Sequence, residues 1–166
     1  MNCQNCGAPM TLLLEKRQFS CEYCKSIYFP EKNADGIQVI EESSDYLCPI
    51  SKINLNYAYI DDIPLYYCPH CQGLLIDQFV FRVAVDFLRS HSNQPPIQPP
   101  PFDSKELKRS LTCPRCGLLM TTHPYGGPGN IVIDNCPICH LVWMDYGEIR
   151  RVIRTPGRDN KHSEWD

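Results

Sequence analysis

The segment "CPRCGLLMTTHPYGGPGNIVIDNCPICHLVWMDYGEIRRVI", residues 113–153, decides the fold. Two Cys-Pro-x-Cys pairs stand nineteen residues apart in it, and the turn sequence Gly-Gly-Pro-Gly-Asn lies between them. Two short loops of this kind, joined by a hairpin, can place four thiolates around one tetrahedral zinc ion. The segment therefore predicts a zinc site on a β-hairpin, with the ligands Cys113, Cys116, Cys136 and Cys139.

A similar arrangement opens the chain. Fourteen residues separate its two Cys-x-x-Cys pairs, and "MTLLLEK" and "RQFSC" predict the strands of a hairpin. We predict a second zinc site here, with the ligands Cys3, Cys6, Cys21 and Cys24.

The repeat between these two is one cysteine short. It has Ser51 where the second cysteine is expected, so Cys48, Cys68 and Cys71 form only a partial metal site. A fourth ligand could come from elsewhere, and the candidates are His70, His91 and His123. Alternatively, water fills an open position, as in catalytic zinc sites, or the site holds no metal. The large apolar content of this repeat favours the empty site, because a small domain needs a metal mainly when its core is too small.

The second and third repeats align beyond their cysteines, with a constant offset of 68 that places Leu75 on Trp143 and Asp77 on Asp145. The shared order is metal loop, apolar strand, aspartate and helix. Both aspartates are predicted helix N-caps, and Asp145-Tyr-Gly-Glu148 has the form of a capping box. The pattern predicts a small, metal-stabilised α+β fold of tandem zinc ribbons, the last two each followed by a short helix.

The predicted organisation has five parts. They are an N-terminal zinc ribbon (1–45), a degenerate ribbon with an apolar helix (46–92), a proline-rich linker (93–102), a C-terminal ribbon with a helix (103–155) and a flexible tail (156–166). Five prolines in ten residues make the linker a semi-rigid spacer. After it, "SKELKRSL" predicts a short helix.

Composition bounds the compartment and the partners. The chain has eleven cysteines in 166 residues, and paired thiols in a reducing compartment favour metal over disulfides. Its start shows neither a basic region nor an apolar run of secretory length, so we expect a cytoplasmic protein. We expect no membrane partner, since no stretch approaches the ~18 apolar residues of a membrane span. The net charge of −3, without a domain-wide basic face, disfavours tight binding to duplex nucleic acid.

The predicted helix at 77–90 is apolar on two sides and needs cover on both. Another ribbon of the chain, a second copy or another protein could supply the second cover. The predicted partner-binding residues are Phe79, Phe81, Val85 and Leu88. Nucleic acid is the second choice of partner, through Arg150, Arg151 and Arg154, with Arg158 and Lys161 following and Trp143, Tyr146 and Trp165 nearby. A solvated helix face is the simpler interpretation of these arginines.

Residues 113–153, with the order CPxCG, hairpin, CPxC, Trp-x-Asp-x-Gly-Glu-Ile and helix, resemble the bacterial form of the zinc ribbon family named after transcription factor IIB. Residues 48–88 look like a decayed copy without one cysteine, the tryptophan and the Gly-Glu pair. Residues 3–24 are similar to the generic zinc ribbons that often precede such domains. The resemblance implies a zinc ribbon fold with four cysteine ligands, and the family's name implies transcription by analogy.

These features predict a zinc-binding ribbon array that acts as a protein-interaction or scaffolding module. Two zinc ions are expected, or three if the middle repeat is occupied. We expect no enzyme, because the sequence has no phosphate loop or nucleophile–base set and a zinc ion with four thiolates has no position for substrate. The alternatives are a nucleic-acid-binding, transcription-related factor and a rubredoxin-like iron electron carrier, since Cys-Pro-x-Cys loops also suit iron.

Overall fold

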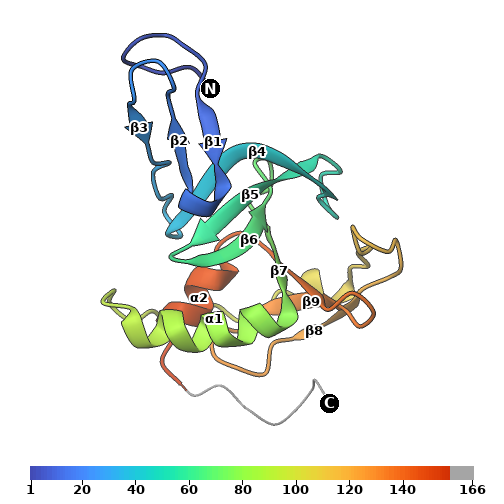
Figure 1. The fold of residues 1–166 in the computed structure, drawn as a ribbon. Coiled ribbons are helices and arrows are strands. Elements are labelled where there is room, and N and C mark those ends of the chain that lie inside the picture. The colour runs from blue at the N-terminus through green and yellow to red at the C-terminus, as the bar shows by residue number, and fades with distance from the viewer. Residues whose placement is uncertain (158–166) are drawn as a thin grey trace.

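The chain forms two antiparallel sheets and two α-helices in residues 1–157, the part that the computed structural model describes. The smaller sheet is N-terminal and contains β1 (Thr11–Leu13), β2 (Gln18–Ser20) and β3 (Ile27–Tyr28). A 3-10 turn, η1 (Leu14–Lys16), joins its first two strands. The strands β1 and β2 are those that the sequence predicted for the first hairpin. Figure 1 shows this sheet standing apart from the rest of the chain, beyond strand β4.

The larger sheet has seven strands and unites the second and third repeats. In spatial order it contains β4 (Ile37–Leu47), β5 (Asn54–Ile60), β6 (Ile63–Tyr67), β7 (Leu74–Asp77), β10 (Leu141–Met144), β9 (Val132–Cys136) and β8 (Thr121–Pro124). The predicted small α+β class is confirmed. The last two ribbons, however, are joined edge to edge rather than strung one after the other.

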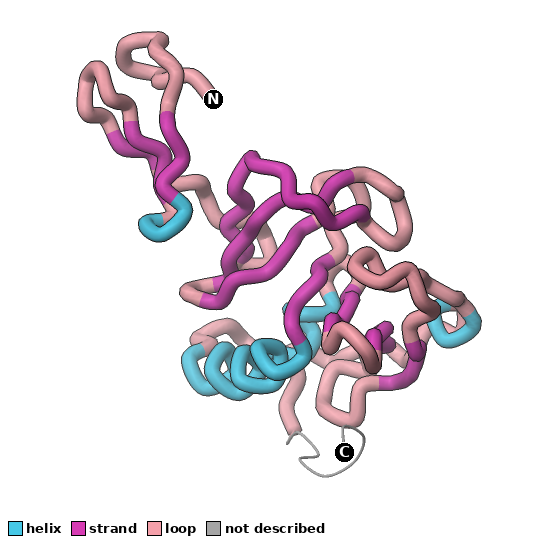
Figure 2. Tube along the Cα trace, turned by 45° about the vertical axis from the view of Figure 1, so that its right-hand side comes forward, coloured by secondary structure: helices cyan, strands magenta, loops and turns pink. Residues whose placement is uncertain are grey.

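The junction between β7 and β10 has a local twofold relation. Leu75 and Trp143, which the offset of 68 makes equivalent, lie opposite each other in this antiparallel pair. Each strand leads into a helix, α1 (Gln78–His91) or α2 (Glu148–Arg154), and the two helices contact each other. Figures 1 and 2 show both helices together beneath the larger sheet. The two segments therefore meet edge to edge through the strands that the sequence alignment makes equivalent, a pairing that the alignment itself did not predict.

Residues along β7 and β10 alternate between two cores, as strand geometry requires. Leu74, Ile76, Val142 and Met144 face the helices, whereas Leu75 and Trp143 join a second core that contains buried cysteines. Trp143 is fully buried and covers Gly73 so closely that a Cβ there would lie 2.2 Å from the indole Cζ2. Glycine at position 73 is thus a packing requirement of the tryptophan.

The helix α1 is buried on one side only. Phe81, Val85 and Leu88 are 0%, 1% and 6% exposed and pack in the core between the helices and the sheet. Their assignment as partner-binding residues is therefore corrected, because they cover this chain's own hairpins. Phe79 remains exposed at 59%, and Val83 and Phe87 are exposed beside it at 70% and 42%.

The two predicted N-caps differ. Asp77 caps α1 as predicted, since its carboxylate accepts hydrogen bonds from the N–H groups of Phe79 and Val80 at 2.8 and 3.2 Å. At α2 only half of the capping box forms: Glu148 accepts from the Asp145 N–H at 2.7 Å, but the Asp145 carboxylate makes no bond to the helix. The cap position is taken by Gly147, whose φ of 78° suits glycine.

Two predicted segments differ from the structure in detail. Strand β4 crosses the boundary expected at 45/46 and makes residues 37–47 the edge of the larger sheet. The helix predicted in "SKELKRSL" shortens to a 3-10 turn, η2 (Glu106–Lys108).

Within residues 1–157, neither helix has the length and apolar character that crossing a bilayer requires.

The proline-rich segment 93–102 contains no helix or strand, and it lies against the body of the protein. The Ile97 N–H donates to the carbonyl of Arg154 at 3.1 Å, and Arg154 Nε donates to the carbonyl of Pro95 at 3.0 Å. Asn130 donates to the Pro100 carbonyl at 3.0 Å. The segment is therefore a strap fastened to the end of α2 and to the loop before β9. Of the predicted tail, residues 158–166 lie outside the described residues.

Candidate metal centres

All six loops that carry predicted ligands share one backbone geometry. In each, the residue four positions after the first ligand has a positive φ between 54° and 76° and its N–H donates to the carbonyl of that ligand at 2.8–3.0 Å. These residues are Gly7, Lys25, Lys52, Gln72, Gly117 and His140. The loop that carries Ser51 follows this pattern as fully as the loops with two cysteines. The hairpins thus bring three pairs of loops together, one pair for each repeat.

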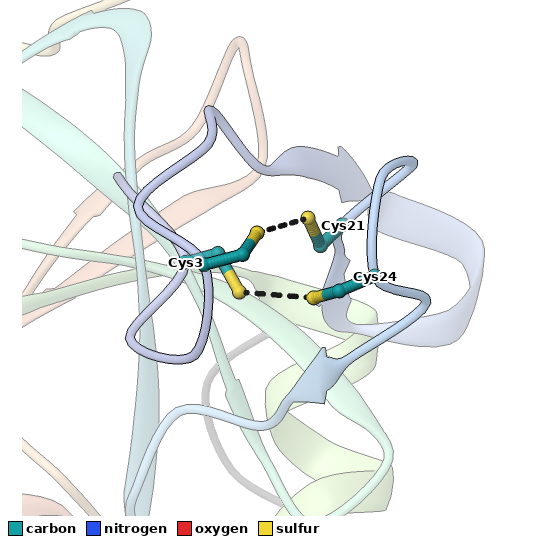
Figure 3. A group of neighbouring side chains, drawn as sticks. Cys3, Cys21 and Cys24 are labelled. Carbon is teal, nitrogen blue, oxygen red and sulfur yellow. Dashed lines mark hydrogen bonds between the residues drawn. The ribbon is translucent and has the colours of Figure 1, made fainter.

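The N-terminal loops bring four cysteines to one point (Figure 3). The sulfur of Cys3 lies 3.5 Å from that of Cys24, and the sulfur of Cys6 lies 3.5 Å from that of Cys21. All four sulfurs lie within 4.8 Å of one another. The edge of a tetrahedral zinc–thiolate site is about 3.8 Å for a Zn–S distance near 2.3 Å. The arrangement can therefore hold a metal ion, as the spacing predicted.

The C-terminal loops form an equivalent group from Cys113, Cys116, Cys136 and Cys139, also within 4.8 Å. The sulfurs of Cys116 and Cys136 lie 3.6 Å apart. The Leu118 N–H lowers the pKa of the Cys116 thiol to about 7, whereas burial and the neighbouring sulfurs raise that of Cys139 to about 12. Such a spread is expected where converging thiolates repel one another, and a cation in their midst would favour all four charged forms.

The middle group consists of Cys48, Cys68 and Cys71, also within 4.8 Å of one another. The sulfurs of Cys48 and Cys71 are 3.5 Å apart, and Ser51 Oγ lies 3.2 Å from the sulfur of Cys68. The serine hydroxyl thus occupies the side of the group where a fourth cysteine would stand. Cys48 and Cys68 are fully buried, so this group is more enclosed than the other two.

No histidine joins this group among residues 1–157. His91 stacks on Phe87 at the end of α1 and hydrogen-bonds its carbonyl, whereas His123 Nε2 lies 2.8 Å from Asn135 Oδ1. His70 is exposed in its loop and contributes no nitrogen to the cluster. The alternative of a recruited histidine ligand finds no support in this arrangement, because the described ring nitrogens do not join the three sulfurs.

The three arginines proposed for nucleic acid have intramolecular partners. Arg150 Nε lies 3.3 Å from the buried carboxylate of Asp35, and Arg151 donates to Glu148 at 3.2 Å. Arg154 holds the proline strap, as described above. These contacts give this helix face a structural role, in place of the solvated face that the sequence suggested. Arg158, Lys161 and Trp165 lie outside the described residues.

An ionic network behind the C-terminal centre was not predicted. Arg109 pairs with both Asp134, which is fully buried, and Asp145. Asp145 also accepts a hydrogen bond from the Trp143 indole at 3.2 Å. The network explains why the Asp145 carboxylate does not cap α2. The network joins the segment around Arg109 to β9 through Asp134 and to the residue after β10, Asp145. These residues are distant in the sequence, so no local pattern could indicate the contact.

A buried glutamate completes this region. Glu148 accepts the N–H groups of Asp145 and Val132 at 2.7 and 3.0 Å, which joins the start of α2 to β9. Burial raises the pKa of its carboxyl to about 8, against the effect of these donors. Its role in the described structure is to position the helix beside the sheet.

Comparison with protein-family models, with curated proteins and with solved structures gives no match. The likeness to the zinc ribbon family of transcription factor IIB therefore stays a prediction from the cysteine loops and the Trp-x-Asp-x-Gly-Glu segment. What the structure adds is three cysteine groups with the spacing needed to hold metal ions.

Proposed function

We propose that the chain is a zinc-ribbon protein that binds another polypeptide, with zinc at both four-cysteine centres and one face of α1 as the contact surface. The observation that carries this proposal is the exposed stripe of Phe79, Val83 and Phe87, four residues apart on a helix whose opposite side is buried. Covering such a stripe removes apolar surface from water and is favourable. An exposed stripe of this kind is typical of helices that dock in a groove of a partner.

The choice of zinc follows from the donor set. Four sulfurs in a tetrahedral arrangement suit zinc or iron, and zinc is the common structural ion of such hairpin loops. Four thiolates leave no open position, which supports a structural rather than catalytic centre. The same loops support membership of the bacterial family related to the transcription factor IIB ribbon. The free thiols support a reducing, cytoplasmic location.

Nucleic acid is a weaker candidate than protein. Arg150, Arg151 and Arg154 would have to leave Asp35, Glu148 and the proline strap before they could contact phosphate. That exchange costs contacts which the folded chain already makes. The exposed stripe of α1 has no ion pair to break, since Phe79, Val83 and Phe87 are apolar and between 42% and 70% exposed.

The test is a charge placed in the stripe. Val83→Glu alters its most exposed member, and Arg82→Ala on the same helix changes the net charge equally without altering the stripe. Self-association is measured by sedimentation velocity on the purified chain, and other partners by capture from a nuclease-treated lysate at raised salt. We expect complexes with the wild-type chain and with Arg82→Ala, and loss of complexes with Val83→Glu at unchanged zinc content.

The opposite pattern would replace this function with the second candidate. Complexes that survive Val83→Glu but disappear on nuclease treatment, or weaken steeply with salt, would indicate nucleic acid as the ligand. A chain that stays monomeric and captures nothing, with or without nuclease treatment, would also contradict the proposal.

A further inference from the structure

The loop that carries Ser51 keeps the detailed geometry of a metal-binding loop. The N–H groups of Ile50 and Ser51 point at the sulfur of Cys48, with N–S distances of 3.4 and 3.3 Å. The N–H of Cys71 points in the same way at the sulfur of Cys68, at 3.4 Å. Equivalent N–H contacts occur in the C-terminal centre, to Cys113 and Cys136. Such donors stabilise thiolates, the form in which cysteine binds a metal.

The spacing of the four heteroatoms also fits a tetrahedral ion. Ser51 Oγ lies 3.2 Å from the sulfur of Cys68, and the sulfurs of Cys48 and Cys71 lie 3.5 Å apart. With Zn–S near 2.3 Å and Zn–O near 2.0–2.2 Å, neighbouring ligands of one zinc ion stand about 3.5–3.8 Å apart. The observed separations are close to those edges. Ser51 Oγ therefore lies beside the sulfur group, where it can supply a fourth ligand.

We propose that this group is a third, exchangeable zinc site, with Cys48, Cys68, Cys71 and Ser51 Oγ as its four ligands. Binding displaces three thiol protons and leaves the serine hydroxyl as a neutral oxygen ligand. A hydroxyl is a poorer ligand than a thiolate for this ion, so the site holds zinc more weakly than the two four-cysteine centres. The inference shares with the proposed function only the preference of zinc for thiolates, and it does not depend on the partner.

Packing alone accounts for two of these residues but not for the group. Buried free cysteine often behaves as a small apolar side chain, and Cys48 and Cys68 are fully buried. Cys71 and Ser51 are only partly buried, yet their side chains converge on the same point. Convergence of two partly exposed polar groups with two buried thiols is what a coordination site requires.

The surrounding fold makes the third ion dispensable for folding. One loop joins β4 to β5 and the other joins β6 to β7, and β5, β6 and β7 lie inside the seven-stranded sheet and contribute to both apolar cores. Loss of the ion therefore leaves the hairpin in place. This differs from small metal domains in which zinc binding and folding are one event. The middle site is thus placed to gain and lose zinc while the protein stays folded.

The experiment measures zinc retained per chain as a chelator competes with the fully loaded, full-length protein. We expect three ions in the wild-type chain, of which one leaves at a chelator concentration at least tenfold lower than the others, without loss of the folded amide spectrum. Cys71→Ala should retain two ions. Ser51→Ala should lose the third ion more readily still, and Ser51→Cys should hold it as firmly as the first two. With cobalt in place of zinc, the third ion should add less sulfur-to-metal absorption in the wild type than in Ser51→Cys.

Three results would overturn the site. One is a wild-type chain that saturates at two ions while only Ser51→Cys accepts a third. Another is Ser51→Ala with unchanged affinity, which would assign the fourth position to water. The third is a Cys71→Ala variant that still binds three zinc ions per chain. A chain with fewer than two ions would instead refute the proposed four-cysteine zinc centres, so the two failures are distinguishable.

Discussion

The identity or side-chain position of some residues in this chain is set by contacts with residues that are distant in the sequence. Gly73 is required by Trp143, and the Asp145 carboxylate is drawn from its expected cap position by Arg109. The grouping of the cysteines, in contrast, was predictable from the sequence, because a Cys-x-x-Cys loop is a local structure with a fixed spacing. The cap at Asp77 was predictable for the same reason.

The contact at Gly73 gives the first prediction. Gly73→Ala should destabilise the fold by about 1–3 kcal/mol, the range for overpacking, because the new methyl group overlaps the Trp143 ring. The backbone at Gly73 is not in the left-handed region, so the cost arises from the overlap rather than from φ. Denaturant unfolding measures the loss.

A double-mutant cycle supplies the control for this contact. Trp143→Phe removes the ring atoms nearest to the added methyl group, so it should recover part of the loss in the Gly73→Ala background. Strictly additive losses would contradict the account of this contact.

At the scale of elements, strand and helix identities were predicted well and their pairing was not. The hairpins follow from alternating apolar residues and from turn sequences, which are local. The pairing of β7 with β10 joins residues almost seventy positions apart, and nothing in either strand specifies its partner. The same limit explains the error on α1: periodicity identified two apolar sides, but not which one the sheet would cover.

The contact between the helices yields the second prediction. Arg89 near the end of α1 donates hydrogen bonds to the carbonyls of Val152, Thr155 and Gly157 around the end of α2. Arg89→Ala should cost about 2 kcal/mol of unfolding free energy, since several hydrogen bonds to a charged group are lost. Arg89→Lys should recover only part of this, because an ammonium lacks the planar fork. Equal stability of all three proteins would contradict the proposed role of Arg89.

For the whole molecule, the sheet topology defines two units, one for each sheet. The first ribbon has its own three-stranded sheet, whereas the other repeats share one sheet and its cores. The sequence led us to expect three ribbons in series. It could not reveal the fusion of two of them, because fusion depends on which strand edges meet.

This topology gives the third prediction, on a matched pair of exposed ligands, Cys6 and Cys116. Cys6→Ser should abolish amide protection within residues 1–36 and leave the larger sheet protected. Cys116→Ser should lower protection in β8, β9 and β10 and, through the β7–β10 pair, in β7 and α1 as well. Hydrogen exchange resolved by residue checks both. If β7 and α1 stay fully protected after Cys116→Ser, the shared sheet is not the cooperative unit inferred here.

The central claim, that both four-cysteine groups are zinc centres, is tested most directly by native mass spectrometry of the full chain purified without chelator. The account predicts a mass above that of the reduced, metal-free chain by at least two zinc ions, each less the two protons that its charge replaces. The third ion should appear only when free zinc is supplied or retained. A folded chain whose mass shows no bound metal, iron in place of zinc, or disulfides in place of metal would contradict the claim.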